Sequence, residues 1–164
     1  MFPDLAACDG AWNRPGVVFD PPHCNRAAGN TGSNPVGDGC NVADLCALGW
    51  HVCVDQADVA TRGGPAACGA LAQASGVLYV TRERGDPVSG ACGPAISGNN
   101  NVYGCGTLGG LIPLAAACMP FDHWLRVVAG ECPAPWDCGT DPANEGQNVI
   151  KTGLPGGGVL CCRD

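Results

Sequence analysis

The sequence contains little positive charge. Lys151 is the only lysine, seven arginines are scattered along the chain, and the 164 residues carry a net charge of −7 at pH 7. Proteins that bind nucleic acids neutralise the phosphates with clustered lysine and arginine side chains. The composition therefore argues against nucleic acid as a partner.

Long apolar runs are missing as well. The longest candidate, residues 108–119, is interrupted by Gly109, Gly110 and Pro113. A helix that crosses a bilayer needs about 20 apolar residues. The sequence therefore predicts no membrane span.

Several motifs of catalysis and cofactor binding are also absent. No serine lies in a Gly-x-Ser-x-Gly elbow, no glycine-rich phosphate motif precedes a helix, and no Cys-x2-Cys pair offers two thiolates to zinc. We expect His51 to be structural, and His23 lies in a proline-rich segment. Asp122 adjoins His123, but adjacent residues of a strand face opposite ways. We therefore predict no catalytic residues and no certain cofactor, and we favour a protein that is not an enzyme.

Cysteine, glycine and proline, by contrast, are abundant, with 13, 26 and 14 residues. This composition is typical of a loop-rich fold held by disulfides in an oxidising compartment. We predict six disulfides and one cysteine left over, with the connectivity open. We expect a secreted or extracellular protein whose leader has been removed. The cysteines are Cys8, Cys24, Cys40, Cys46, Cys53, Cys68, Cys92, Cys105, Cys118, Cys132, Cys138, Cys161 and Cys162.

Residues 40–53 hold the densest group of distinctive side chains in the chain. Cys40, Cys46 and Cys53 lie here together with Trp50 and His51. A loop rich in Asn, Asp and Gly precedes this segment, and a helix-then-strand pattern follows it. We therefore predict that residues 40–53 clamp a loop onto the core.

The predicted helices and strands are short. Asn41 is the expected N-cap of a helical turn that Gly49 ends, and Asp55 caps a helix that reaches Arg62. Pro65 opens a further helix over residues 66–74, which Gly76 closes. The strand candidates are residues 16–19, 50–52, 77–81, 101–103, 124–128, 148–151 and 158–162, the last two as a closing hairpin.

The expected organisation is one secreted domain over residues 1–164. Residues 1–39 form an extended segment tethered by disulfides through Cys8 and Cys24, and residues 40–164 form the core. Within the core, residues 85–120 look irregular apart from one short strand candidate, and Cys92, Cys105 and Cys118 staple them.

Two oxygen-rich loops are candidate calcium sites, because calcium takes about six to eight oxygen ligands in irregular geometry. Ordinary turn chemistry is the alternative explanation for both loops. The candidate ligands are Asn30, Asn34, Asp38, Asp141, Asn144 and Glu145.

Aromatic residues make up only 5% of the chain, so each tryptophan is informative. We expect Trp50 and Trp124 in the core. Trp12 and Trp136 lie in polar, proline-containing contexts and are candidate contact residues. The complete set of candidate binding residues is Trp12, Trp136, Asn99, Asn100, Asn101 and Tyr103.

The segment Cys46-Ala47-Leu48-Gly49-Trp50-His51-Val52-Cys53 resembles the Cys-Pro-x-Gly-Trp-His-x-Pro hallmark of bacterial secreted major paralogous surface domains. It departs from that hallmark at Ala47 and Cys53, where the family usually has proline. The resemblance implies a C-type-lectin-like or formylglycine-generating-enzyme-like fold, and by analogy a disulfide from Cys68 to Cys161 or Cys162. The calcium-dependent sugar motif of such lectins is not present in the sequence.

We therefore predict a small, disulfide-rich α+β domain with a C-type-lectin-like fold. Its expected function is extracellular recognition or adhesion, in which loops fixed by disulfides bind a glycan or a protein at a cell surface, with calcium as a candidate ion. One alternative is a self-assembling structural subunit of an extracellular filament or coat, which would form homo-oligomers. A second alternative is a small secreted hydrolase.

Overall fold

A computed structural model describes residues 2–18, 21–71, 75–86, 91–92, 99–112, 118–128 and 130–164. Most of the regular structure is strand: β1 (Leu5–Asp9), β2 (Trp50–Val52), β3 (Leu78–Asp86), β4 (Ala91–Cys92), β5 (Asn101–Gly106), β6 (Gly110–Leu111), β7 (His123–Leu125), β8 (Trp136–Asp137), β9 (Ile150–Lys151) and β10 (Gly157–Arg163). The helices are α1 (Gln56–Arg62), α2 (Gly64–Leu71) and α3 (Glu145–Asn148), with 3-10 turns η1 (Val42–Leu45) and η2 (Pro142–Asn144).

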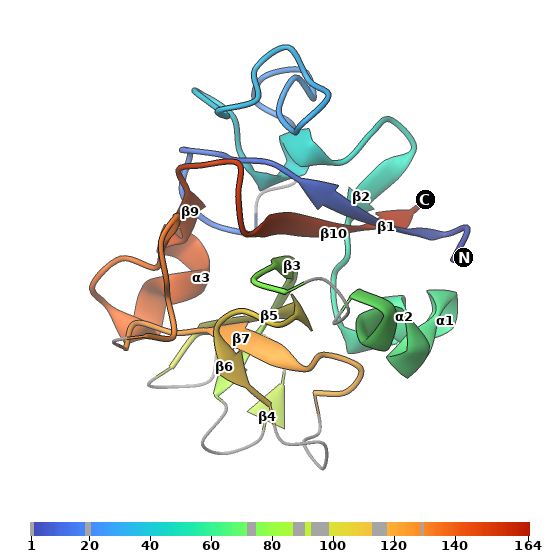
Figure 1. Ribbon diagram of the computed structural model, residues 1–164, viewed down its shortest axis with the longest axis vertical. Coiled ribbons are helices and arrows are strands. Elements are labelled where there is room, and N and C mark those ends of the chain that lie inside the picture. The colour runs from blue at the N-terminus through green and yellow to red at the C-terminus, as the bar shows by residue number, and fades with distance from the viewer. Residues whose placement is uncertain are drawn as a thin grey trace.

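Strand β10 pairs with three other strands of the main sheet, whose order is β1-β10-β3-β5-β7-β6 (Figure 1). One edge of β10 pairs antiparallel with β1. Its other edge pairs first with β3, in parallel, and then with β2. Both ends of the described chain therefore meet at one strand, and the N and C labels lie close together in Figure 1.

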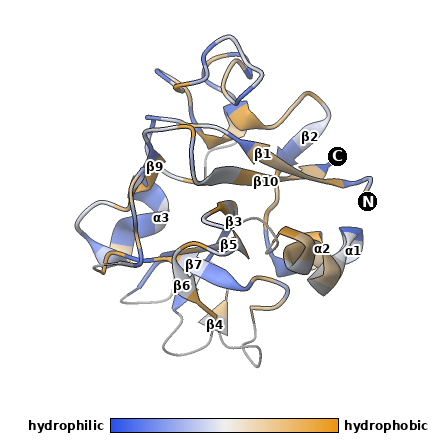
Figure 2. Cartoon of the chain, viewed as in Figure 1, coloured by the Kyte–Doolittle hydropathy of each residue, from blue (hydrophilic) through white to orange (hydrophobic). Residues whose placement is uncertain are grey.

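The sheet has a hydrophobic core on each face. Along β10, Val159 and Cys161 belong to one buried cluster, whereas Leu160 and Cys162 belong to the other. This alternation is expected because successive strand residues point to opposite faces. Figure 2 shows hydrophobic residues gathered on α2 and along β1 and part of β10.

Six disulfides connect the described chain, and Cys8 is free. Cys46 pairs with Cys161 and Cys53 with Cys162, so residues 40–53 are fixed to both faces of β10. We call these four residues the clamp cysteines. The predicted number of disulfides and the predicted clamp are confirmed. The remaining pairs are Cys24–Cys40, Cys68–Cys105, Cys92–Cys118 and Cys132–Cys138.

Two disulfide expectations are wrong. Cys68 pairs with Cys105, because α2 packs against β5, and not with Cys161 or Cys162, which the clamp occupies. Cys8 does not tether the N-terminal segment by a disulfide. That segment is held instead by the pairing of β1 with β10 and by the Cys24–Cys40 disulfide.

Several predicted elements are confirmed. Asn41 precedes η1, β2 covers residues 50–52, and the Asp55 side chain accepts a hydrogen bond from the amide of Asp58 at the start of α1. Strand β3 includes most of residues 77–81 and continues to Asp86, and β7 includes the first part of residues 124–128. The second predicted helix is confirmed as far as Leu71, and residues 72–74 lie outside the described residues.

Two strand expectations are wrong, whereas the strand predicted over residues 101–103 is confirmed and extends to Gly106. Residues 16–18 form no strand, although the amides of Gly16 and Val17 donate to residues near α3, and Phe19 lies outside the described residues. Strand β9 pairs with β8 rather than β10, whose two edges are already occupied. Residues 101–106 are a fully buried strand inside the sheet.

The result is a small mixed domain with mostly strands, few helices and six disulfides. The predicted disulfide-rich domain with both helices and strands is confirmed. Multiple disulfides are typical of proteins in an oxidising, extracellular compartment. Among the described residues, no helix has the length and apolar character needed to cross a bilayer.

Candidate functional site

The two tryptophans predicted to contact a ligand are buried. Trp12 is 0% exposed and Trp136 is 4% exposed, and their rings meet edge to face with centroids 5.5 Å apart. Trp12 also bridges to Lys151 across an isolated β-bridge. Trp50 and Trp124, which were expected in the core, are only partly buried. The prediction for Trp12 and Trp136 is therefore wrong, because both pair through their backbones with the buried Lys151. Trp50 and Trp124 pack against the two core clusters, so their expected core positions are confirmed in part.

The predicted asparagine and tyrosine contacts also lie mostly inside the protein. Asn100, Asn101 and Tyr103 are fully buried, since β5 runs between β3 and β7. Asn99 is partly exposed, and its amide donates to Asp86 at 3.1 Å. Of the six predicted binding residues, only Asn99 has a side chain that a ligand can reach in this conformation.

The predicted calcium ligands have local structural roles. The Asn34 amide donates to the carbonyl of Asp38 at 2.7 Å, and the Asp141 side chain accepts from Asn144 at 2.6 Å. Glu145 points into the core, so it does not join Asp141 and Asn144 around a common centre. These contacts are the turn and cap chemistry that was the alternative explanation for both loops.

Among the described residues, three groups of side chains have the spacing of metal ligands, and each includes cysteine sulfur from a disulfide. One such group is His51, Asp58 and Cys162, and the other two contain Cys24 with Cys40 and Cys68 with Cys105. Metal ions bind the thiolate form of cysteine. In the oxidised protein the sulfur atoms of these groups are therefore not available to coordinate a metal ion.

Glu145 has a buried carboxyl group that bonds both β5 and the chain after β7. Its two oxygens accept hydrogen bonds from the amides of Val102 at 3.3 Å and Val127 at 2.9 Å. Burial raises the pKa of Glu145 to about 8, against the lowering effect of those two amides. The folded protein therefore retains a proton on Glu145 that the unfolded chain loses near pH 4.5.

The pH dependence of stability follows from this difference. Between about pH 4.5 and about pH 8 the folded state binds more protons at Glu145 than the unfolded state, so stability falls as the pH rises. One proton gives a slope of at most about 1.4 kcal/mol per pH unit. Glu145→Gln should flatten this slope in urea unfolding curves, and it should be less stable at low pH because one amide loses its acceptor. A slope that is unchanged in the variant would contradict this role.

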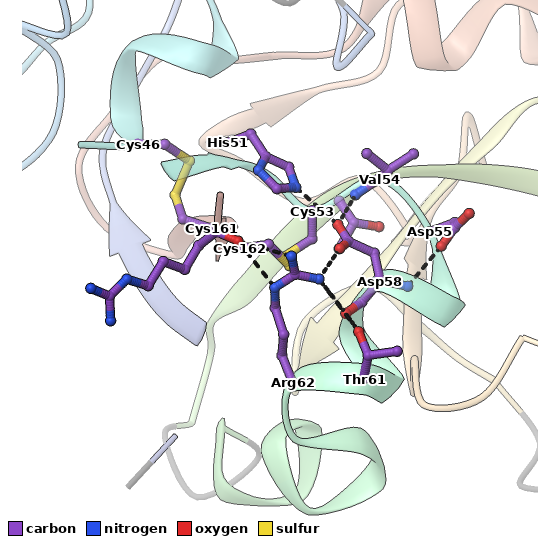
Figure 3. The surroundings of a disulfide bond; sticks show 12 residues. Cys46, His51, Cys53, Val54, Asp55, Asp58, Thr61, Arg62, Cys161 and Cys162 are labelled. Carbon is purple, nitrogen blue, oxygen red and sulfur yellow. Dashed lines mark hydrogen bonds and ion pairs between the residues drawn. A yellow bond between two sulfur atoms is a disulfide. The ribbon is translucent and has the colours of Figure 1, made fainter. Parts of the chain in front are cut away.

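His51 lies in a charged cluster beside the clamp cysteines (Figure 3). Its Nδ1 is 2.6 Å from Asp164 and its Nε2 is 3.2 Å from Asp58, whose carboxylate also pairs with Arg62. Figure 3 shows Thr61 next to Arg62, but the Thr61 hydroxyl donates to the backbone carbonyl of Asp58 and not to His51. No described nucleophile contacts this imidazole, and the cluster connects α1 to β2 and the end of β10.

His123 contacts its neighbour Asp122 after all. The distance from His123 Nδ1 to Asp122 Oδ1 is 3.1 Å. The argument against this pair assumed that both residues lie in one strand, whose side chains alternate in direction. Asp122 lies just before β7, so the alternation does not apply to it. Asp122 also accepts from the amide of Gly106 at 3.0 Å, so the pair anchors β5 to β7.

A polar cleft of about 450 Å³ lies between β1, β3 and the loop before β10. Asp9, Asn30 and Tyr79 supply its polar side chains. The Tyr79 hydroxyl donates to one oxygen of Asp9 at 2.8 Å, and the Asn30 amide donates to the other at 3.3 Å. Burial and the bond to Asp9 raise the pKa of Tyr79, which keeps its hydroxyl protonated as a donor. We call these three residues and their surroundings the Asp9 cleft.

The opposite wall of the Asp9 cleft is the loop 153–157, which includes the exposed side chains of Leu154 and Pro155. Lys151 fixes this loop from inside the protein. Its ammonium group, 0% exposed, donates to the carbonyls of Gly10, Gly153 and Leu154 and lies 5.6 Å from the centre of the Trp136 ring. Burial lowers the pKa of Lys151 to about 8.

This buried lysine makes the irregular loop rigid. Carbonyls of a loop that are removed from water need donors, and a single ammonium group supplies three. Trp136 adds a further donor, because its indole nitrogen bonds the carbonyl of Gly156 at 3.2 Å. The cleft is therefore formed before any ligand arrives, which lowers the entropic cost of binding.

The free cysteine lies next to this cleft in sequence. Cys8 is partly buried, and burial together with the charge of Asp9 raises the pKa of its thiol to about 11. Because the thiolate is the reactive form, Cys8 should alkylate slowly at neutral pH in the folded protein.

Mass spectrometry after iodoacetamide treatment checks this expectation. The folded protein should take up little label, and the denatured but unreduced protein should take up one label per chain. Rapid labelling of the folded protein, or no label after denaturation, would contradict a shielded free thiol at Cys8.

Comparison with known proteins finds no matching family model, no matching curated protein and no matching solved structure. The functional argument therefore depends on the geometry of the site.

Proposed function

We propose that this chain is an extracellular recognition module that binds a neutral glycan in the Asp9 cleft. The observation that carries the proposal is the carboxylate of Asp9, held by Tyr79 and Asn30 and facing a cleft with a rigid opposite wall. Ligand sites commonly combine a few fixed polar groups with apolar surface in this way.

The chemistry of the cleft suits sugar hydroxyl groups. Asp9 uses one lone pair of each oxygen for Tyr79 and Asn30, so both oxygens keep capacity to accept from hydroxyl donors. The carbonyl of the exposed Asn30 side chain is a further acceptor. Leu154 and Pro155 offer apolar surface to the C–H face of a pyranose ring. Since these groups bind hydroxyls directly, recognition should not require calcium.

The fold resemblance supports the proposal in outline. The two helices come early, between β2 and β3, and cysteines lie in the closing strand, as the resemblance to C-type-lectin-like domains implied. The Cys68–Cys105 disulfide departs from the pairing that the resemblance implied. We retain a C-type-lectin-like fold as part of the proposal, without carrying over any sugar specificity from that family.

A glycan array tests the function directly. Oxidised wild-type protein should bind a subset of neutral glycans equally with and without chelator. Asp9→Asn keeps the size of the side chain but replaces an acceptor oxygen by a donor, so binding should fall by about tenfold or more. Asp38→Asn is the matched control, because Asp38 is an exposed aspartate that likewise accepts from an asparagine, Asn13.

The outcomes are distinct. Binding lost in Asp9→Asn but kept in Asp38→Asn supports the cleft. No signal on any glycan, or a signal that Asp9→Asn leaves unchanged, contradicts it. A signal that chelator abolishes would contradict direct recognition by Asp9 and favour a calcium site.

The two alternatives stay predictions. A structural subunit of a filament or coat should change its particle size with concentration in light scattering, whereas a recognition module should remain monodisperse. A secreted hydrolase that uses its histidines should lose activity when His51 and His123 are replaced singly.

A further inference from the structure

A second cleft, of about 340 Å³, lies on another part of the molecule. Its lining consists of Arg14, Pro15, His23, Asn41 and Gln147. These residues come from four separate stretches of the chain, and the Cys24–Cys40 disulfide brings His23 and Asn41 together from flanking positions. We call this hollow the Arg14 cleft.

The walls of the Arg14 cleft are held by the buried carboxylate of Asp44, which is 1% exposed. It accepts four backbone hydrogen bonds, from His23 at 2.9 Å, Cys24 at 3.0 Å, Arg26 at 2.9 Å and Asn41 at 2.9 Å. Arg26 has a φ of 59°, a left-handed conformation that is uncommon for residues other than glycine. The carboxylate therefore fixes both cleft residues, His23 and Asn41, in position.

Asn41 has an unused acceptor in this cleft. The residue is 1% exposed, and its amide nitrogen donates to the carbonyl of Pro21 at 2.8 Å. Its Oδ1 is buried without a hydrogen-bond partner. A buried polar atom without a partner costs free energy and calls for an explanation, of which a ligand or a water is the usual one.

Three other residues that line the same cleft have unused donors. Arg14 uses Nε for the carbonyl of Gly39 at 2.9 Å, and its two terminal nitrogens bond to no residue that the structure describes. Gln147 accepts from Asn100 through Oε1 at 2.7 Å, which leaves its amide group to donate. His23 is exposed beside them and offers a ring nitrogen.

We propose that the Arg14 cleft binds a uronic acid residue of an acidic glycan, with the carboxylate on Arg14 and a neighbouring hydroxyl donating to Asn41. A guanidinium binds a carboxylate through two parallel hydrogen bonds, and Gln147 and His23 can add donors to the same group. The hydroxyl next to the carboxylate satisfies the orphaned Oδ1 of Asn41.

The lining favours a sugar acid over the carboxylate of a peptide. Pro15 is the only apolar residue among the five that line the cleft, so a peptide side chain would find little apolar surface there. A polyhydroxylated ring with one charge matches the polar lining. The site is also a local concentration of donors in a chain of net charge −7, which would otherwise repel acidic glycans.

Isothermal titration calorimetry with simple glycosides tests the proposal. Methyl glucuronide and methyl galacturonide should bind the wild-type protein, and acetate should bind much more weakly because it lacks the hydroxyl. Arg14→Gln should weaken uronide binding by about tenfold or more, and Arg14→Lys, which keeps the charge but loses the planar fork, should give an intermediate loss.

Two further variants control the experiment. Gln147→Ala should weaken uronide binding; it also removes the acceptor of the buried Asn100 amide, so circular dichroism must show that the variant remains folded. Arg163→Gln removes an exposed arginine far along the chain, paired with Asp4 at 3.6 Å, and should leave uronide binding unchanged.

Uronide binding that Arg14→Gln and Gln147→Ala leave intact would overturn the proposal, as would no binding of either uronide. Acetate bound as tightly as the uronides would show an adventitious anion site and would also overturn it. These results are independent of the neutral glycan array, because the Asp9 cleft contributes no residue to the Arg14 cleft.

Discussion

Replacing all four clamp cysteines by alanine is expected to unfold the protein at 25 °C. The Cys46–Cys161 and Cys53–Cys162 disulfides join residues 115 and 109 positions apart, so together they restrict the unfolded chain strongly. The chain-entropy relation gives about 7 kcal/mol for losing both. The total stability of a domain is only roughly 5 to 15 kcal/mol.

Removing one clamp disulfide should cost much less. When Cys46–Cys161 remains, it already holds position 53 close to position 162, and the second disulfide then closes a loop of roughly nine residues. Each pair of alanine substitutions should therefore cost about 2.5 kcal/mol by itself. The two effects are coupled, since the combined loss exceeds their sum by about 2 kcal/mol.

Urea unfolding of the two pair variants measures their separate losses, and far-UV circular dichroism of the fourfold variant without urea shows whether any folded protein remains. Cys132→Ala with Cys138→Ala is the control, because that disulfide spans six positions and should cost about 2.5 kcal/mol without coupling to the clamp. A fourfold variant that stays folded, with a loss no larger than the two pair variants add up to, would refute the clamp as the main covalent constraint.

Asp44→Ala is expected to lower the free energy of unfolding by at least about 3 kcal/mol. The substitution removes the acceptor of four backbone amides, and hydrogen bonds to a charged group contribute about 1.5 to 3 kcal/mol each. It also releases the left-handed turn at Arg26, whose guanidinium bonds the carbonyls of Cys46, Ala47 and Trp50. The damage should therefore reach the clamp segment.

Asp38→Ala is the matched control for Asp44. Asp38 is exposed, and its side chain accepts one hydrogen bond, from the Asn13 amide at 2.7 Å. Its loss should cost less than about 1 kcal/mol. If the two substitutions destabilise the protein equally, the four amides of residues 23, 24, 26 and 41 find other acceptors, and the role assigned to Asp44 is contradicted.

The sequence predicted the clamp because its evidence is local. Three cysteines, a tryptophan and a histidine lie within residues 40–53, and the short helical elements around them begin after Asn41 and Asp55 as capping rules require. Which cysteine meets which depends on the path of the whole chain. Local sequence carries no information on that path, so the expected partner of Cys68 was wrong.

The Asp9 cleft was missed for the same reason. Asp9, Asn30 and Tyr79 meet only because β10 brings β1 and β3 to its two edges, and the loop 153–157 comes from the far end of the chain. Asn30 was predicted as a calcium ligand, but no sequence motif marked Asp9 or Tyr79 as a binding residue.

Lys151 did carry a usable signal. It is the only lysine of the chain and lies in an apolar strand pattern, where a solvated charge would be out of place. The burial of Trp12 and Trp136 follows from its neighbourhood, since β9 pairs with β8 and bridges to Trp12. The proline and polar neighbours of Trp12 and Trp136 suggested that both lie at the surface. Strand pairing with the buried Lys151 instead places both tryptophans inside the protein.

Chemical-shift mapping by NMR tests the central claim most directly, namely that the Asp9 cleft recognises neutral sugar. Isotope-labelled, oxidised protein is titrated with galactose, mannose, glucose and N-acetylglucosamine. The account predicts that at least one sugar shifts the amides of Asp9, Asn30, Gly156 and Gly157 and leaves those of residues 141–144 unchanged. Shifts confined to residues 99–112 or 132–148, or no shifts with any of the four sugars, would contradict it.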